Sequence, residues 1–107
     1  AAYLGAPGHL MLVALRTDEI VAQLAAVVHL HPDKPPELYI DEVGVTPSLQ
    51  RRGIARRMMA EILDLARELG CAQAWVGTET GNRPARGLYR SLGPALEDPF
   101  ILYLYEL

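Results

Sequence analysis

The chain has 107 residues, half of them hydrophobic, a net charge of −3 and one cysteine. That length and composition suit one small domain with a real core and argue against a disordered chain. The acidic balance excludes a broad nucleic-acid-binding surface, Cys71 alone excludes a disulfide framework, and no apolar run reaches the roughly 18 residues of a membrane span. We therefore expect a cytoplasmic protein with no nucleic-acid or membrane partner.

The first elements read as a hairpin followed by a third strand. Residues 9–16 (HLMLVALR) and 20–31 (IVAQLAAVVHLH) are apolar runs separated by a short turn, which predicts two paired strands. The segment 32–37 contains three prolines and predicts a loop. Residues 38–45 (LYIDEVGV) predict a strand with two carboxylates inside an otherwise apolar run.

A helix and a further strand come next. Apolar residues recur at helical spacing across residues 53–69, and Gly70 supplies the stop; they are Ile54, Met58, Ile62, Leu65 and Leu69. Residues 71–80 (CAQAWVGTET) predict another strand. A strand, a helix and a strand in this order normally make the two strands parallel.

The last third predicts a short helix at 85–93, a loop, and a terminal strand at 100–107 (FILYLYEL). The resulting fold class is α/β or α+β in a single domain, with a mixed sheet of about five strands and two helices. The apolar run 100–107 would also suit pairing with a second subunit, so a homodimer is one expectation and the oligomeric state stays open.

Four arginines surround a glycine where the long helix begins: Arg51, Arg52, Arg56 and Arg57. Positive charge is unfavourable there, because the helix dipole and the unpaired N–H groups already make that end positive. A bound polyanion would offset this cost, and Gly53 would let it approach the backbone. The stretch therefore predicts a phosphate site; the alternative is a solvated basic turn, and we expect Arg57 to be solvated in either case.

The chain lacks the nucleotide-triphosphate loop and the dinucleotide fingerprint. Its turn instead resembles motif A of the GCN5-related N-acetyltransferase (GNAT) superfamily, V-x-P-x-x-[QR]-x-x-G-x-[GA], through Val45, Pro47, Gln50, Gly53 and Ala55. A second stretch, NRPARGLYRSLG, resembles the superfamily's motif N-x-x-A-x-x-L-Y-x-x-x-G through Asn82, Ala85, Leu88, Tyr89 and Gly93. The two motifs occur in the order of the superfamily, and the resemblance spans residues 38–93.

The resemblance implies a mixed, largely antiparallel sheet with a central parallel strand pair and two helices. The superfamily's opening strand and two helices have no counterpart in this sequence, so we expect an acetyltransferase domain at 1–107 that lacks them. Pro94 replaces an aromatic residue that usually follows Gly93. A fainter likeness, carried by residues 20–45 together with LYRSLG, is to the type I aminoglycoside 3-N-acetyltransferases and bears only on the substrate.

Acetyl-coenzyme A is the cosubstrate that the resemblance implies. Its pyrophosphate would lie on the N–H groups of residues 51–55, and its pantetheine arm along residues 43–45. The implied binding residues are Val43, Val45, Gln50, Arg51, Arg52, Gly53, Ile54, Ala55, Arg56, Asn82 and Tyr89. The alternative for Asn82 is a helix cap. No metal is expected, because His29 and His31 have no evident third ligand.

The implied general acid is Tyr89, which would protonate the leaving thiolate; its alternative role is to anchor a short helix. A carboxylate must accept the proton of the amine. Asp41 and Glu42 point to opposite faces in a regular strand, although a bulge could swap the faces. We favour Asp41 as the base with Glu42 as its partner or substitute; either could instead bind a cationic substrate or form a structural ion pair.

The sequence thus predicts an N-acetyltransferase that transfers acetyl from acetyl-coenzyme A to a primary amine by direct attack in a ternary complex. The acidic strand favours a cationic small-molecule acceptor such as an aminoglycoside, with a peptide or protein amine as an alternative. A non-catalytic acyl-coenzyme A binding module is a further reading. A nucleic-acid-binding domain that uses the arginine cluster is disfavoured by the acidic net charge.

Overall fold

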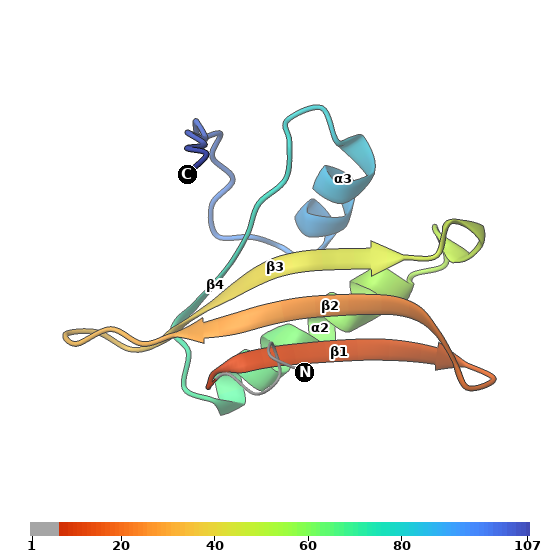
Figure 1. The fold of residues 1–107 in the computed structure, drawn as a ribbon, viewed down its shortest axis with the longest axis horizontal. Helices are drawn as coiled ribbons and strands as arrows, with labels where there is room; N and C mark the ends of the chain where they lie inside the picture. The colour runs from red at the N-terminus through yellow and green to blue at the C-terminus, as the bar shows by residue number, and fades with distance from the viewer. Residues whose placement is uncertain (1–6) are drawn as a thin grey trace. The chain divides into compact units, whose positions relative to one another are not determined.

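The computed structural model describes residues 7–107, which form two compact units. The first unit ends at Gly77, and the second comprises Thr78–Leu107. The elements of the first unit are β1 (His9–Arg16), β2 (Glu19–His29), β3 (Glu37–Val45), the 3₁₀ turn η1 (Pro47–Leu49), α2 (Ile54–Glu68) and β4 (Gln73–Val76) (Figure 1). The second unit contains α3 (Arg83–Ser91).

The first unit is a four-stranded mixed sheet in the order β1-β2-β3-β4. β1, β2 and β3 pair antiparallel, and β3 pairs parallel with β4. The predicted mixed sheet with a parallel pair across a helical connection is therefore confirmed. β1 and β2 are joined by a two-residue turn in which Thr17 and Asp18 have φ of 50° and 65°, the left-handed conformation that matches the twist of a hairpin.

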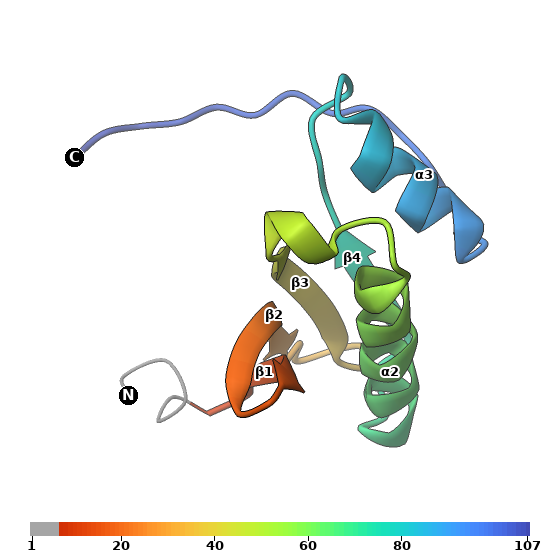
Figure 2. The ribbon, with the colours of Figure 1, turned by 90° about the vertical axis from the view of Figure 1, so that its right-hand side faces the viewer.

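One face of the sheet is covered by α2 (Figure 2). The helix contributes Met58, Ile62 and Ala66, spaced by four residues, to the buried core. Leu24 of β2 and Leu38 of β3 are, like Ile62, completely buried. Each such side chain contributes about 1.5–3 kcal/mol relative to an exposed position.

A buried carboxylate ties the start of β3 to its neighbours. Glu37 accepts a hydrogen bond from Trp75 Nε1 of β4 at 2.7 Å, and its Oε1 lies 2.8 Å from His31 Nε2 and 3.0 Å from Lys34 Nζ. The bonds from Trp75 and Lys34 hold the pKa of Glu37 below its usual value. This cluster fixes the proline-containing loop to the parallel strand pair.

The two histidines of the 20–31 segment have different neighbours. His29 packs against the Tyr39 ring, with centroids 4.2 Å apart, whereas His31 lies beside Glu37. Within residues 7–107, no group of three His, Cys, Asp or Glu side chains could hold a metal ion. The expectation that the protein uses no metal remains a prediction.

The prediction of a terminal strand at 100–107 is wrong. From Gly93 to Leu107 the chain has no regular secondary structure, and its large apolar side chains are at least 70% exposed. High strand propensity gives no strand without a hydrogen-bonding neighbour. The sheet of the described residues accordingly has four strands, not five.

Other boundaries shifted by smaller amounts. β4 covers only four of the ten residues predicted at 71–80. β2 ends at His29, two residues before its predicted end, and the next residue, Leu30, is 83% exposed. α3 begins at Arg83, two residues before the predicted start. In the part of the chain that the structure covers, no helix has the length and apolarity to cross a bilayer.

Candidate active site

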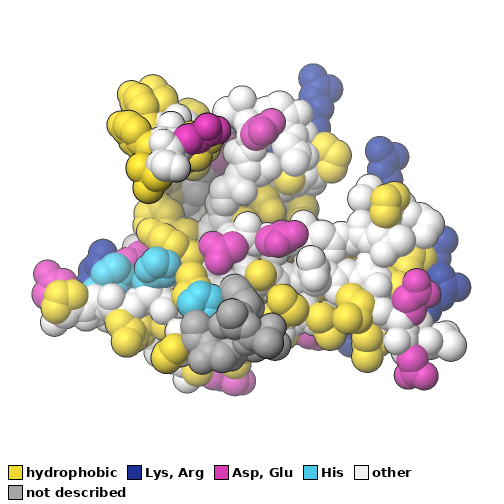
Figure 3. All heavy atoms as spheres, in the orientation of Figure 1, with side chains coloured by type: hydrophobic (Ala, Val, Ile, Leu, Met, Phe, Trp, Pro, Cys, Tyr) yellow, Lys and Arg dark blue, Asp and Glu magenta, His cyan; other side chains and the backbone are white. Residues whose placement is uncertain are grey.

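An extra residue interrupts the pairing of β3 with β2. Ile40 pairs with Ala26 and Glu42 pairs with Ala25, so Asp41 has no opposite residue and forms a β-bulge. Asp41 and Glu42 are both exposed, although Leu38 and Ile40 before them alternate regularly with exposed Tyr39. The bulge that the sequence left open as an alternative is thus present, and both carboxylates are accessible to solvent. Figure 3 shows acidic side chains gathered over the middle of β3.

β3 and β4 part at the same place. Their parallel ladder joins Glu37–Ile40 to Gln73–Val76 and goes no further. The Thr46 N–H bonds to Val21 O of β2, and peptide groups alternate along a strand. Val43 and Val45 therefore turn their peptide groups away from β2, toward the edge that β4 has left.

The turn after β3 is held by local contacts. Pro47 opens the η1 turn, and Leu49 anchors it in the core with 7% exposure. The side chain of Gln50 donates from Nε2 to Val45 O at 3.2 Å, which closes the turn against the strand end. Gln50, which the motif implied to bind the cosubstrate, therefore has a structural role through its side chain.

The N-terminus of α2 is open to a ligand. Gly53 is its N-cap residue with φ of 79°, no side chain caps the helix, and the first turn contains no acidic residue. A Cβ atom built on Gly53 would meet nothing within 4 Å. The first N–H groups of the helix thus lie uncapped beside open space, which fits the binding of a phosphate group.

The arginines surround this helix start, where Figure 3 shows basic side chains gathered. Arg57 is 84% exposed at its side chain, as expected, and lies 3.5 Å from Glu61. Arg51 is exposed and has φ of 65°, an unusual conformation for a residue other than glycine. Arg52 is also exposed and lines, with Arg57, an open cavity of about 530 Å³.

That cavity lies between the end of the β1–β2 hairpin and the start of α2, and it is mostly apolar. Its other lining residues include Leu15, Val21, Leu49, Ile54 and Met58. It does not include Asp41, Glu42 or the peptide edge of β3. Arg52 is therefore placed toward the hairpin, a position that the sequence did not indicate.

The remaining two site residues belong to the second unit. Asn82 Oδ1 accepts a hydrogen bond from the Ala85 N–H at 3.2 Å, so Asn82 is the N-cap of α3, the alternative that the sequence left open. Tyr89 is partly buried in α3, and this burial raises the pKa of its phenol. The site residues from Asp41 to Arg56 form one continuous segment of the first unit, whereas Asn82 and Tyr89 belong to the second unit.

The fold and these motifs agree with comparisons to known proteins. The model of the acetyltransferase (GNAT) family matches residues 1–93. The chain therefore belongs to the GNAT acetyltransferase family.

Individual relatives share this assignment. The N-alpha-acetyltransferase RimI of Mycobacterium tuberculosis is 34% identical over 85 residues, 79% of this chain and 52% of that protein. An aminoglycoside acetyltransferase from an uncultured soil metagenomic sample, solved with trehalose, superposes with a TM-score of 0.93 at 25% identity, over 99% of this chain and 70% of that one. The aminoglycoside N-acetyltransferase AAC(6')-Iy, solved with coenzyme A, shares the fold with a TM-score of 0.85 at 20% identity, over 99% of this chain and 82% of that one. This chain spans about half the length of the RimI protein.

We predict that Gly53→Ala destabilises the protein. Alanine is strained at φ of 79° although the space around it is open, and the left-handed conformation costs about 1–2 kcal/mol per residue. Gly44→Ala is the matched control, because Gly44 also has open space around it but no positive φ. Urea denaturation should show a lower midpoint for Gly53→Ala only; equal midpoints would contradict the strained conformation.

Proposed function

We propose that this protein is an N-acetyltransferase that moves the acetyl group of acetyl-coenzyme A directly to a primary amine within a ternary complex. The observation that carries the proposal is the uncapped N-terminus of α2, which the η1 turn connects to the unpaired end of β3. In a member of the GNAT family, this pair of features suits a phosphate-bearing acyl thioester.

The pyrophosphate would be held by backbone N–H groups of residues 51–55. Arg51, Arg52 and Arg56 would add charge-assisted bonds to its oxygens. Gln50 would hold the turn in shape through its bond to Val45 O. The pantetheine amides would pair with the peptide groups of Val43 and Val45, which have no β4 partner in the described sheet.

Acetyl-coenzyme A supplies an activated acyl carbon and a thiolate leaving group. Asp41 would accept a proton from the acceptor ammonium, directly or through water, so that the amine nitrogen can bond to the carbonyl carbon. As the carbon–sulfur bond breaks, Tyr89 would donate its phenolic proton to the sulfur, and the second proton of the nitrogen would return through water to the phenolate, which leaves the amide, the free thiol and a neutral Tyr89. Burial keeps this phenol protonated over a wider pH range, because it raises the pKa of Tyr89.

A cationic acceptor is favoured by the two exposed carboxylates of the bulge. Both can face an amine-rich substrate, one as base and the other as counter-ion. An aminoglycoside fits this chemistry, in keeping with the metagenomic aminoglycoside acetyltransferase. The likeness to RimI favours a peptide or protein α-amine as the second candidate.

A non-catalytic acyl-coenzyme A binding module is the alternative function, because the same helix start and strand edge would bind the ligand without an acceptor. We further propose a cytoplasmic location, since the single cysteine suits a reducing compartment.

Binding of acetyl-coenzyme A is the first test. Isothermal titration of the full-length protein should give a dissociation constant in the micromolar to millimolar range. Arg51→Ala should weaken binding by about tenfold through loss of a charge-assisted bond, whereas Arg67→Ala, in the last turn of α2, should not. The absence of any binding heat at millimolar acetyl-coenzyme A would refute the proposal. If acetyl-coenzyme A binds but no amine in a test panel causes release of the coenzyme A thiol, the binding module is favoured.

The role of Tyr89 is tested by Tyr89→Phe, which removes one oxygen. We expect kcat to fall by about two orders of magnitude with little change in the affinity for acetyl-coenzyme A, because the phenol acts on the leaving group. The raised pKa of Tyr89 implies that wild-type kcat declines on the alkaline side only above the ordinary tyrosine pKa. Thiol-release kinetics with unchanged kcat would remove Tyr89 from the reaction.

The two carboxylates are separated by Asp41→Asn and Glu42→Gln. Asp41→Asn should lower kcat by about two orders of magnitude at neutral pH, with partial recovery at higher pH as the free amine becomes abundant. Glu42→Gln should mainly raise KM for a polycationic acceptor. The reverse pattern, measured with one acceptor over a pH series, would assign the base to Glu42.

A further inference from the structure

α3 has little apolar support of its own. It is nine residues long, and none of its residues is buried. Helices this short are marginal in water unless other contacts hold them. Apolar packing of α3 is limited to partly buried side chains such as Leu88 and Tyr89, so polar contacts contribute to its order.

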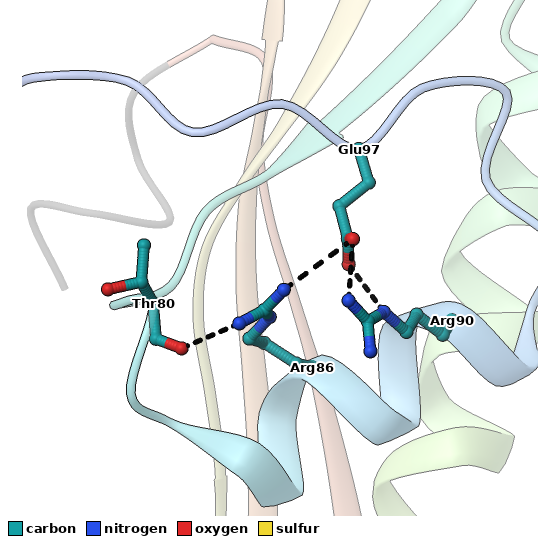
Figure 4. Close-up of polar contacts among 4 residues, drawn as sticks. All are labelled: Thr80, Arg86, Arg90 and Glu97. Atoms are coloured by element: carbon teal, nitrogen blue, oxygen red, sulfur yellow. Dashed lines mark hydrogen bonds and ion pairs between the residues drawn. The ribbon is translucent and has the colours of Figure 1, made fainter.

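The strongest of these contacts meet at Glu97, in the loop after α3 (Figure 4). Arg90 forms a two-pronged pair with Glu97: Nε donates to Oε1 and Nη2 donates to Oε2, both at 2.7 Å. Arg86 Nη2 lies 3.6 Å from the same Oε2. One carboxylate thus engages two guanidinium groups from successive turns of the helix.

Arg86 extends the network to the other side of α3. Its Nη1 donates to the carbonyl oxygen of Thr80, before the helix, at 2.8 Å. The segment that enters α3 and the loop that leaves it are therefore connected across one helix face through Arg86, Arg90 and Glu97. We call these three residues the Glu97 clasp.

An isolated surface ion pair contributes little to stability. The Glu97 clasp differs in two respects: the Arg90 pair is bidentate, and the carboxylate is shared by two arginines that are four residues apart. The hydrogen bond from Arg90 is also the main reason why the pKa of Glu97 lies below its usual value. These features are those of an exposed charge network that does restrict geometry.

We propose that Glu97 is a positioning residue for Tyr89. Its carboxylate binds Arg86 and Arg90, which lie on either side of Tyr89 in the sequence. Through these contacts Glu97 fixes the orientation of α3 about its own axis and keeps the phenol of Tyr89 in its partly buried environment. The effect of Glu97 on kcat rests on the proposed acetyl transfer, whereas its effect on the order of α3 does not.

The test compares Glu97→Gln, which keeps the shape but removes the charge, with Asp98→Asn, which removes the charge of a neighbouring exposed carboxylate that is not part of the Glu97 clasp. Amide hydrogen exchange at low salt should show several-fold faster exchange of the Arg86 N–H, which bonds to Asn82 O, in Glu97→Gln only. A ¹³C titration of tyrosine should show the pKa of Tyr89 falling toward its ordinary value in the same variant. Unchanged exchange and an unchanged titration would overturn the proposal.

Activity supplies the second readout. Glu97→Gln should lower kcat several-fold while KM for acetyl-coenzyme A changes less than twofold, and the paired exchange Glu97→Arg with Arg90→Glu should restore part of both kcat and exchange protection. If Tyr89→Phe leaves kcat unchanged, Tyr89 takes no part in the reaction, and the exchange and titration data alone decide whether Glu97 positions its side chain. If Tyr89→Phe is damaging but Glu97→Gln leaves kcat, exchange and titration at wild-type values, the clasp does not position Tyr89.

Discussion

The extra residue of β3 at Asp41 immediately follows Ile40, the last residue of β3 that pairs with β4. A bulge bends its strand and increases the local twist. Three features of the candidate site lie at this bulge or just after it: both carboxylates are exposed, Val43 and Val45 have no β4 partner, and the strand leads through the η1 turn to the start of α2. The donor and acceptor sides of the proposed reaction thus share one backbone irregularity.

The N-terminus of α2 lacks the residue types that normally stabilise the start of a helix. No side chain caps the helix, no acidic residue stands in its first turn, and Gly53 adopts a left-handed conformation. Arginines at this end oppose the dipole, whereas Asp or Ser would favour it. A ligand that carries negative charge removes this conflict, and local rules broken in one place usually mark a functional site. The arginine cluster is therefore best explained by what binds to it.

Periodicity predicted the elements well where burial is one-sided, as in His9–Arg16 and α2, because alternation and helical spacing follow from the packing itself. It failed at 100–107, because strand propensity says nothing about a partner. The shared exposure of Asp41 and Glu42 depends on a register shift, which no local pattern shows. The bonds of Trp75 to Glu37 and of Gln50 to Val45 were also missed, since each joins residues outside the spacing of a regular element. The cap at Asn82 was the exception, because its residue type and the following proline are local signals.

The two units are held by different forces, and this difference bears on catalysis. The proposed base and the anion site lie on a sheet and a helix that share a buried core around Leu24, Leu38 and Ile62. The proposed acid lies on a helix without a buried residue. Elements with few buried contacts open at lower free energy than core elements, and exposed ion pairs weaken with salt. Ionic strength should therefore act on the proton donor through the Glu97 clasp while the carboxylates of β3 keep their geometry.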